Sequence, residues 1–502
     1  MKRPIRLLVI VCLVAAAAKS LARAELNSEV RAALADKAFK KGEFGVAIIR
    51  LGEKLDDAKV VCAVNASVPR IPASNLKLVT TAAALELLGK DFRFRTTLLG
   101  RDGDLALVGD GDPALGDAEM LRKVGWNVDT VFRNWADALK ARGISSIRNI
   151  YIDDSIFDEE FVHPNWPPEQ EHKRYVAQVG GLNLNANCVD FYIKTTNFGQ
   201  TVTYTTDPPT NYIQVANACE TGQKNAVWLS RQRGGNAVVL RGEIDVSNDE
   251  PISVTVHDPP MFAGAVLQEV FAIAGIKVDG QVERDRTIRL QLAQATTAPT
   301  TEATKRWIPI AIHETPIAAV LARANKDSMN VYAEALCKRI GFAASGASGS
   351  WQSGTAAVGA FLQTAGVPTN EFSLDDGCGL SKQNQISPNA IARVLAHLYG
   401  GSNRDAFLAS LSVAGSDGTL EKRFRDSDLR GRVFGKSGYV NGVSSLSGYV
   451  KAKDGQWYAF SILMNGVSDI ATCKQVQERI VKSIDDGTPA VSTVLHATPK
   501  GD

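Results

Sequence analysis

The 502-residue sequence is poor in histidine and cysteine, with six of the first and seven of the second. The histidines are scattered and no two cysteines stand at a C-x-x-C spacing, so the pattern of a zinc site is missing. A G-x-S-x-G elbow is also missing, which argues against an α/β hydrolase with a Ser-His-Asp triad. We therefore expect neither a metal nor another cofactor.

Blocks of like charge are missing as well. Lys and Arg number 56 and Asp and Glu 54, so nucleic acid is not an expected partner. An apolar content of 45% and a charged content of 22% are typical of globular proteins. The chain is too long for one ordinary core, and we expect two or three domains.

The one long hydrophobic run lies at the N-terminus. Three basic residues precede the apolar residues 7–18, and Ala22 and Ala24 supply the small-x-small pattern of a signal peptidase site. The run is too short to span a bilayer comfortably. We expect residues 1–24 to be a signal peptide and the mature chain to be soluble in the periplasm or cell envelope. An uncleaved membrane anchor is the alternative.

Six cysteines would remain after cleavage. They are Cys62, Cys188, Cys219, Cys337, Cys378 and Cys473. An even number in an exported chain permits disulfides, but spacing alone does not decide their connectivity. Cys188 and Cys219 lie in the same middle region and are our candidates for one bridge.

Local patterns predict secondary structure at both ends of the chain. Strands are expected within 46–64, followed by a buried helix at 74–88 that ends at Gly89. Further helices are expected at 317–324, 330–342, 351–365 and 388–399. A three-stranded meander at 432–439, 444–451 and 458–464 and an amphipathic helix at 470–484 follow.

The middle of the chain differs from both ends. Between 92 and 304, short β-like runs alternate with turn clusters and prolines, with one helix expected at 261–275. Residues 294–304 have the composition of a linker. We expect a catalytic domain in two parts, 25–91 and 305–485, with one or two mainly β domains inserted at 92–304. Residues 486–502 are expected to be a loose tail that allows at most a loose membrane association.

Ser74 and Lys77 form the only S-x-x-K pattern in the chain. Residues three apart on a helix share a face, so the Lys77 amine can reach the Ser74 hydroxyl. A serine needs a neighbouring base to become a nucleophile, and a buried amine near another positive charge can be that base. The pattern alone is weak, because an ordinary Ser and Lys at a helix start look the same.

Ser328 and Asn330 offer a hydroxyl and a carboxamide on the same side of an extended or turning segment. The hydroxyl can relay a proton, and the amide can hold a substrate peptide group. A helix cap is the ordinary explanation for such a serine. Ser387 and Asn389 repeat the pattern, but Ser387 is well placed as the N-cap of the helix after it. We therefore prefer Ser328.

Lys436, Ser437 and Gly438 are the only K-[ST]-G match, on the first strand of the predicted meander. Gly438 would let another backbone come close, and Lys436 would bring a fixed positive charge to a cleft. An exposed β-turn is the alternative. This pattern arises rarely by chance and is the most informative of the three.

In this order, the three motifs form the set of the penicillin-recognising serine enzymes. The sequence resembles the low-molecular-mass penicillin-binding proteins with D-alanyl-D-alanine carboxypeptidase/endopeptidase activity, in particular the subfamily with a large insertion between the first two motifs. Further stretches similar to that subfamily are 109–113, 181–185, 376–381, 414–420 and 442–449.

The resemblance implies an α+β fold of the β-lactamase/transpeptidase type, with an antiparallel sheet flanked by helices. It implies a serine hydrolase that trims peptidoglycan stem peptides through an acyl-enzyme and is inhibited by β-lactam antibiotics. Carried over to this chain, Ser74 is the acylated nucleophile and Lys77 its general base. Ser328 relays the proton to the leaving D-alanine.

The resemblance also assigns substrate-binding roles. Asn330 would hold the substrate's peptide group. Lys436 would attract the substrate's terminal carboxylate, and the strand residues after it, Ser437, Gly438 and Tyr439, would also bind the substrate. The backbone N–H groups of Ser74 and Tyr439 would form the oxyanion hole. One departure is Cys378, which stands where the family usually has serine.

Two other functions stay open at this point. A β-lactamase or esterase on the same fold differs in how fast the acyl-enzyme is hydrolysed, and motif spacing does not reveal that rate. A non-catalytic wall-binding protein would not require all three motifs to be intact. The balance of carboxypeptidase against endopeptidase, the third-position peptide specificity and a homodimer are also undecided by the sequence.

Overall fold

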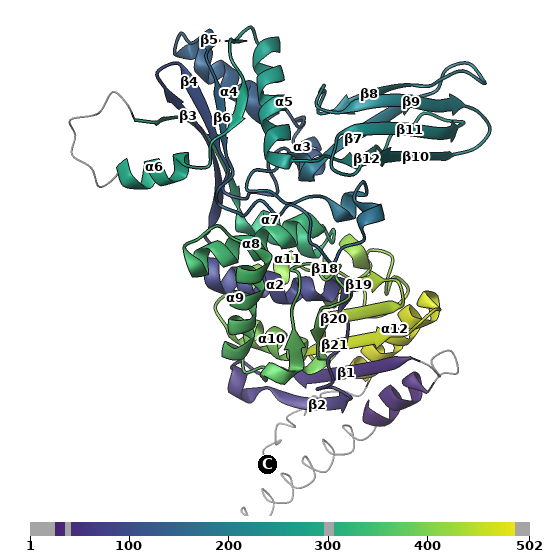
Figure 1. The fold of residues 1–502 in the computed structure, drawn as a ribbon. Coiled ribbons are helices and arrows are strands. Elements are labelled where there is room, and N and C mark those ends of the chain that lie inside the picture. Colours follow the sequence, from purple (N-terminus) through teal and green to yellow (C-terminus); the bar gives the residue numbers. More distant parts are fainter. Residues whose placement is uncertain (1–25, 36–41, 296–305, 487–502) are drawn as a thin grey trace, which may run out of the picture. The chain divides into compact units, whose positions relative to one another are not determined.

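A computed structural model describes residues 26–35, 42–295 and 306–486 (Figure 1). The chain divides into two compact units. Unit 1 comprises Met1–Val79, Phe361–Ser373 and Lys382–Asp502, and unit 2 comprises Thr80–Ala360 and Leu374–Ser381. The predicted signal peptide, most of the predicted linker and nearly all of the predicted tail lie outside the described residues. The predicted domain boundaries stay a prediction.

Unit 1 is built on a six-stranded sheet in the order β18-β19-β20-β21-β1-β2, in which neighbouring strands are antiparallel. These strands are β1 (Glu43–Arg50), β2 (Lys59–Val64), β18 (Ser412–Val413), β19 (Val433–Val440), β20 (Val443–Lys451) and β21 (Trp457–Asn465). The last three match the predicted meander to within one residue at each end. Gly442 has φ +85°, the left-handed conformation that the tight turn between β19 and β20 requires.

Helices cover both faces of this sheet. Leu446 and Val450 of β20 belong to the same buried cluster as the apolar side of α12 (Ile470–Asp486). Tyr449 points to the opposite face, since successive strand residues alternate. There its hydroxyl donates to the Leu395 carbonyl of α10 (Pro388–Gly400) at 2.7 Å. Unit 1 therefore has the sheet-between-helices arrangement that the sequence predicts.

Unit 2 contains a mixed five-stranded sheet in the order β14-β6-β4-β3-β15. Its strands are β3 (Arg93–Arg101), β4 (Asp104–Val108), β6 (Ile150–Asp153), β14 (Val282–Arg284) and β15 (Ile308–Pro316). The sequence predicts helices from residue 307 onward, whereas the structure has the strand β15 there before the first helix. The partner of β15 is β3, about 200 residues earlier in the chain, and local patterns do not reveal such a partner.

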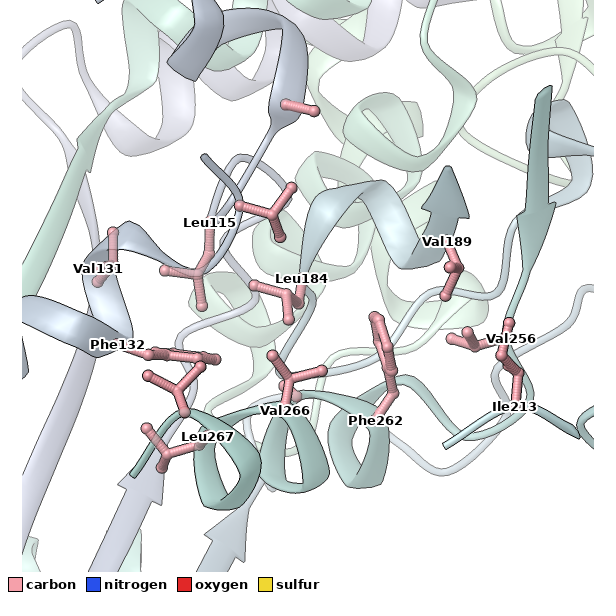
Figure 2. Packing of buried hydrophobic residues seen from close by; sticks show 14 of the residues in the cluster. Leu115, Val131, Phe132, Leu184, Val189, Ile213, Val256, Phe262, Val266 and Leu267 are labelled. Atoms are coloured by element: carbon pink, nitrogen blue, oxygen red, sulfur yellow. The ribbon is translucent and has the colours of Figure 1, made fainter. Parts of the chain in front are cut away.

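The two faces of this sheet bury different clusters. Leu105 and Leu107 of β4 face α4 (Thr130–Ala141) and α5 (Pro259–Ile273), whereas Ala106 faces α6 (Ile288–Ala295). Figure 2 shows Phe132 of α4 close to Val266 and Leu267 of α5 within the larger cluster.

The middle region of the chain, residues 92–304, contains more helix than its sequence patterns predict. The helix predicted at 261–275 is confirmed as α5, and the structure also has α3 (Ala118–Arg122), α4 and α6 in the middle region. The pattern of α4 was available in the sequence, because Phe132, Trp135, Ala136 and Leu139 recur at helical spacing. The sequence-based prediction therefore missed α3, α4 and α6.

The rest of the middle region is β-structure, as predicted. It contains two three-stranded sheets, ordered β12-β7-β8 and β10-β11-β9. The strands are β7 (Cys188–Lys194), β8 (Thr203–Asp207), β9 (Gln214–Thr221), β10 (Ala226–Arg231), β11 (Ala237–Ile244) and β12 (Ile252–Thr255). Inner residues of these strands belong to the same buried cluster as α5. Figure 2 shows Val189 of β7, and Val256 just after β12, near Phe262 of α5.

The remaining elements complete the two units. The helices after β15 follow the predicted ranges to within three residues: α7 (Ile317–Asn325), α8 (Asn330–Ser345), α9 (Trp351–Thr364) and α10. Shorter elements are β5 (Ser146–Ile147), β13 (Lys277–Val278), β16 (Phe372–Ser373), β17 (Gln385–Ile386) and α11 (Arg404–Ser410). Within the described ranges, no helix has the length and apolar content needed to cross a membrane.

All six described cysteines are buried, and none of them forms a disulfide. The expected bridge between Cys188 and Cys219 is therefore wrong. Cys188 begins β7 in one three-stranded sheet, and Cys219 lies on β9 in the other, so a shared region did not bring the two sulfurs into bonding geometry. Burial raises the pKa of the Cys188 thiol to about 12, and this side chain serves as an apolar packing group.

Candidate active site

Ser74 lies in a short 3-10 turn, η3 (Ala73–Asn75), from which α2 (Leu76–Leu88) continues. Lys77 follows one turn later and is fully buried, and its Nζ donates a hydrogen bond to Ser74 Oγ at 3.0 Å. The i,i+3 spacing thus brings the Lys77 amine within hydrogen-bond distance of the Ser74 hydroxyl. Ala73 has φ +48°, a left-handed conformation that costs a residue with a Cβ about 1 kcal/mol and needs support from its surroundings.

Strands β19 and β20 supply that support. The Asn75 side chain donates from Nδ2 to the Lys436 carbonyl at 2.8 Å and accepts from the Ser447 hydroxyl at 2.6 Å. The Ser445 hydroxyl donates to the Pro72 carbonyl at 2.7 Å. Three neutral hydrogen bonds therefore tie the turn to the sheet. Asn75 is not among the predicted site residues, because no local pattern shows what its amide contacts.

Gly438 lets the turn approach the sheet. A Cβ at this position would lie 2.2 Å from Ser445 Oγ and 3.0 Å from both Asn75 N and Pro72 O. Two of these atoms are backbone and cannot rotate away. The requirement for glycine here is one of space, because Gly438 is not among the residues with a positive φ.

The other residues of the third motif are spread along β19. Lys436 is buried in mid-strand opposite Ser447, so the motif is not an exposed turn. Its Nζ donates to the Ser437 carbonyl at 2.7 Å. Tyr439 is 60% exposed. Unit 1 thus places Ser74 and Lys77 beside the strand that carries the lysine, serine, glycine and tyrosine of this motif.

Ser328 and Asn330 lie in unit 2, where α7 passes into α8. Ser328 has φ +59°, and Met329 is the N-cap residue of α8 without a side-chain cap. The ordinary explanation of Ser328 as a helix cap therefore does not apply. Asn330 is the first residue of α8, and its Nδ2 donates to the Tyr175 carbonyl at 2.7 Å.

Ser387, the residue of the repeated S-x-N pattern, has the structural role that the sequence predicts. It is the N-cap of α10, and its Oγ accepts from the Ala390 N–H at 2.9 Å. Its hydroxyl also donates to Glu371, which accepts from Asn389 as well. Both side-chain hydrogen bonds of Ser387 thus serve the start of α10.

Three buried side chains that could ligate a metal ion lie close together in unit 2. They are Glu334, Asp376 and Cys378, and their ligand atoms lie within 4.8 Å of one another. Hydrogen bonds already account for both carboxylates. Glu334 accepts from the backbone N–H groups of residues 377 and 378 and from Trp351 Nε1 at 2.7 Å. Asp376 accepts from Trp166 Nε1 at 2.9 Å and from two further backbone N–H groups.

This group organises the loop 374–381 rather than offering open ligand positions. Burial, followed by the nearby charge of Asp376, raises the pKa of Glu334 to about 7. In the sequence, Cys378 is one of the six cysteines that permit disulfides and a departure from the family pattern. In the structure it is a buried thiol, outside any disulfide, beside Asp376, with 3.9 Å between Sγ and Oδ2.

A model of the D-Ala-D-Ala carboxypeptidase 3 (S13) family matches residues 26–486. The chain belongs to this family. A D-alanyl-D-alanine carboxypeptidase of Actinomadura sp. is 31% identical over 476 residues, which cover 88% of this chain and 81% of that protein. The D-alanyl-D-alanine carboxypeptidase DacB of Haemophilus influenzae is 24% identical over 439 residues, covering 83% and 85% of the two chains.

The fold is shared with a solved member of this group. The crystal structure of penicillin binding protein 4 from Haemophilus influenzae matches with a TM-score of 0.72 at 22% identity, covering 91% of this carboxypeptidase and 99% of that chain. The predicted fold class is thereby confirmed. Family membership confirms the predicted activity class, a serine-type D-Ala-D-Ala carboxypeptidase.

Proposed function

We propose that Ser74 is the nucleophile of this carboxypeptidase and Lys77 its general base. The supporting observation is the 3.0 Å contact between the fully buried Lys77 Nζ and the Oγ of the half-buried Ser74. Burial disfavours the charged form of an amine, and only the neutral form accepts a proton. In the reactive state the hydrogen bond then reverses, and the hydroxyl donates to the amine.

The proposed reaction has two steps. Ser74 Oγ attacks the carbonyl carbon of the D-Ala-D-Ala bond and its proton passes to Lys77. The carbon–nitrogen bond breaks, and D-alanine leaves with a proton on its amine. Water then attacks the acyl-enzyme, which releases the shortened peptide and returns a proton to Ser74.

The other motif residues have proposed roles in the same reaction. Ser328 relays the proton to the leaving amine, and Asn330 holds the substrate's peptide group. Lys436 attracts the terminal carboxylate, while the strand through Ser437, Gly438 and Tyr439 aligns the peptide. The order of the three motifs along the chain supports this assignment.

The substrate and the place of action belong to the same proposal. We infer that peptidoglycan stem peptides are cleaved at terminal and at cross-linking D-alanyl bonds, and that β-lactams acylate Ser74. The signal-like residues 1–24 support export to the periplasm or cell envelope. A mature N-terminus at Glu25, read by sequencing the secreted protein, would test the export.

A fluorescent penicillin tests the nucleophile. Wild-type protein is expected to be labelled covalently and Ser74→Ala to remain unlabelled. Ser387→Ala is the matched control, because it removes a buried serine of the repeated pattern. It should lose about 1 kcal/mol of stability with its helix cap but keep its labelling. Undiminished labelling of Ser74→Ala would reject the assignment.

Product masses from purified wall peptides test the substrate. Loss of one D-alanine from a pentapeptide reports carboxypeptidase action, and conversion of cross-linked dimers to monomers reports endopeptidase action. Rapid turnover of a chromogenic cephalosporin would instead favour the β-lactamase alternative.

A further inference from the structure

Arg323 is a buried cation that touches three carboxylates in unit 2. It lies on α7 and is 4% exposed. Its Nη1 donates to Asp327 Oδ2 and to Glu119 Oε2, each at 2.7 Å. Its Nη2 donates to Asp117 Oδ2 at 2.9 Å. Asp117 is fully buried, whereas the side chains of Glu119 and Asp327 are 44% and 33% exposed.

These contacts reach the residue before Ser328 directly. Asp327 precedes Ser328, and the Arg323 backbone carbonyl accepts from the Met329 N–H at 3.2 Å. Ser328 between them has φ +59°. A serine in this left-handed conformation persists only when its surroundings hold it there. Arg323 therefore hydrogen-bonds to both neighbours of Ser328: its side chain to Asp327 and its backbone carbonyl to Met329.

The same network reaches the far side of Asn330. The Tyr332 hydroxyl donates to Asp117 Oδ2, the oxygen that Arg323 also contacts. Tyr332 is fully buried on the first turn of α8, and Asp117 additionally caps α3 by accepting from the Met120 N–H at 2.9 Å. One arginine thus connects the residue before Ser328 with the residue two places after Asn330.

The charge states in the network reinforce one another. Burial alone would raise the pKa of Asp117, but Arg323 and the Tyr332 hydroxyl lower it below its ordinary value. Burial alone would likewise lower the pKa of Arg323, but the charges of Asp117 and Asp327 raise it. Both groups stay ionised, so removing either leaves a buried charge without its partner.

We propose that Arg323 is a positioning residue for the reaction. Through Asp327 on one side and Asp117 with Tyr332 on the other, it fixes the backbone that presents Ser328 and Asn330. This inference rests on the proposed function in that Ser328 and Asn330 must act on the bound substrate. A planar guanidinium is needed because it directs donors along several fixed lines, which an ammonium group does not.

Asp327→Ala is the sharpest test, because it removes the contact nearest Ser328 at a partly exposed site. Glu478→Ala in unit 1 is its matched control. Glu478 is 34% exposed and accepts from Arg423, another buried arginine, at 2.6 Å. The acylation rate constant at saturating benzylpenicillin is expected to fall about 10-fold in Asp327→Ala and to stay unchanged in Glu478→Ala, with similar melting temperatures.

Substitutions of the arginine itself should act more strongly. Arg323→Met is expected to slow acylation about 100-fold, and Arg323→Lys should recover little of the loss. Arg423→Met, which removes a buried arginine with partners Glu478 and Gln477, should lower the melting temperature without slowing acylation. Tyr332→Phe, which removes one hydroxyl, should slow acylation several-fold.

The outcomes separate this inference from the proposed function. Wild-type protein that fails to react with penicillin would reject the proposed function whatever Arg323 does. Reactive wild-type protein together with Asp327→Ala and Tyr332→Phe variants acylated at the wild-type rate would reject the positioning role. These two variants also decide the matter if Arg323→Met does not fold.

Discussion

The turn around Ser74 in unit 1 and the segment around Ser328 in unit 2 share one feature, a left-handed residue with a side chain. Ala73 has φ +48° and Ser328 has φ +59°. The contacts that hold them differ. Neutral hydrogen bonds from Asn75, Ser445 and Ser447 hold the first, and a buried arginine with its carboxylates holds the second.

This difference determines what each region tolerates. Neutral hydrogen bonds work only if the turn can approach the sheet closely, so unit 1 should be sensitive to added volume. Buried ion pairs have already lost their hydration, so unit 2 should be sensitive to the removal of one charge or proton. Four further substitutions test this contrast, in addition to those at Arg323.

Gly438→Ala should have the largest effect. The new Cβ would press on the backbone of Pro72 and Asn75 and push the Ser74 turn off the sheet. Acylation by penicillin is expected to fall at least about 100-fold, since small displacements of reacting groups are costly. The measurement is the rate of labelling by fluorescent penicillin, with melting temperature as the check on folding.

Gly235→Ala is the control for that substitution, because a Cβ there meets no atom within 4 Å and the position is not among those with a positive φ. It should be labelled at the wild-type rate. A Gly438→Ala variant that is labelled equally fast would show that close approach is not what holds the turn.

Asn75→Ala should have the next largest effect. It removes the hydrogen bonds to the Lys436 carbonyl and from the Ser447 hydroxyl, and we expect a loss of about 1–3 kcal/mol in stability with about 10-fold slower acylation. Urea unfolding and penicillin labelling measure the two effects. Asn217→Ala is the control, because it removes a similar hydrogen bond from a side-chain amide to the Val202 carbonyl at 2.8 Å. This variant should lose stability but be acylated at the wild-type rate.

Glu334→Gln tests the buried charges of unit 2 through pH. Burial and then Asp376 raise the folded pKa of Glu334 to about 7 from an ordinary value of 4.5. Between these values the folded protein keeps a proton that the unfolded chain releases, so wild-type stability falls as pH rises through this window. Glutamine has no such proton.

The expected result is a melting temperature that declines less steeply for Glu334→Gln than for wild type between pH 4.5 and 7. Expressed as free energy of unfolding, the decline across this window should differ between the two proteins by about 2–3 kcal/mol. Glu371→Gln changes another buried carboxylate with hydrogen-bond partners and controls for the loss of an acceptor. Parallel pH curves for wild type and Glu334→Gln would contradict the prediction.

Glu314→Ala should have the smallest effect. Its ion pair with Arg95, at 2.8 Å, joins side chains that are 37% and 64% exposed. Water and salt screen such a pair, so we expect a change below about 1 kcal/mol in urea unfolding and none in acylation. A larger loss would mean that exposure does not separate the weak ion pairs of unit 2 from the strong ones.

Several features needed the folded chain because the informative residues are far apart in sequence. The strand β15 was missed because its partner β3 lies about 200 residues away. The predicted Cys188–Cys219 disulfide is absent although both cysteines lie in the same region of the sequence. Whether two sulfurs can bond depends on the direction of the side chains in the fold, which proximity in sequence does not set. Helix α4 is different, because its apolar spacing was visible and was passed over.

The sequence by itself determined the family, the order of the motifs, the Ser74–Lys77 pair and the helix cap at Ser387. These depend on helical spacing and capping, which act within a few residues. Only the tertiary structure decided that Asn75 holds Lys436 across 361 positions and that Arg323 meets Asp117 across 206. Contacts over such separations arise when packing brings the segments together, and no short stretch of sequence encodes them.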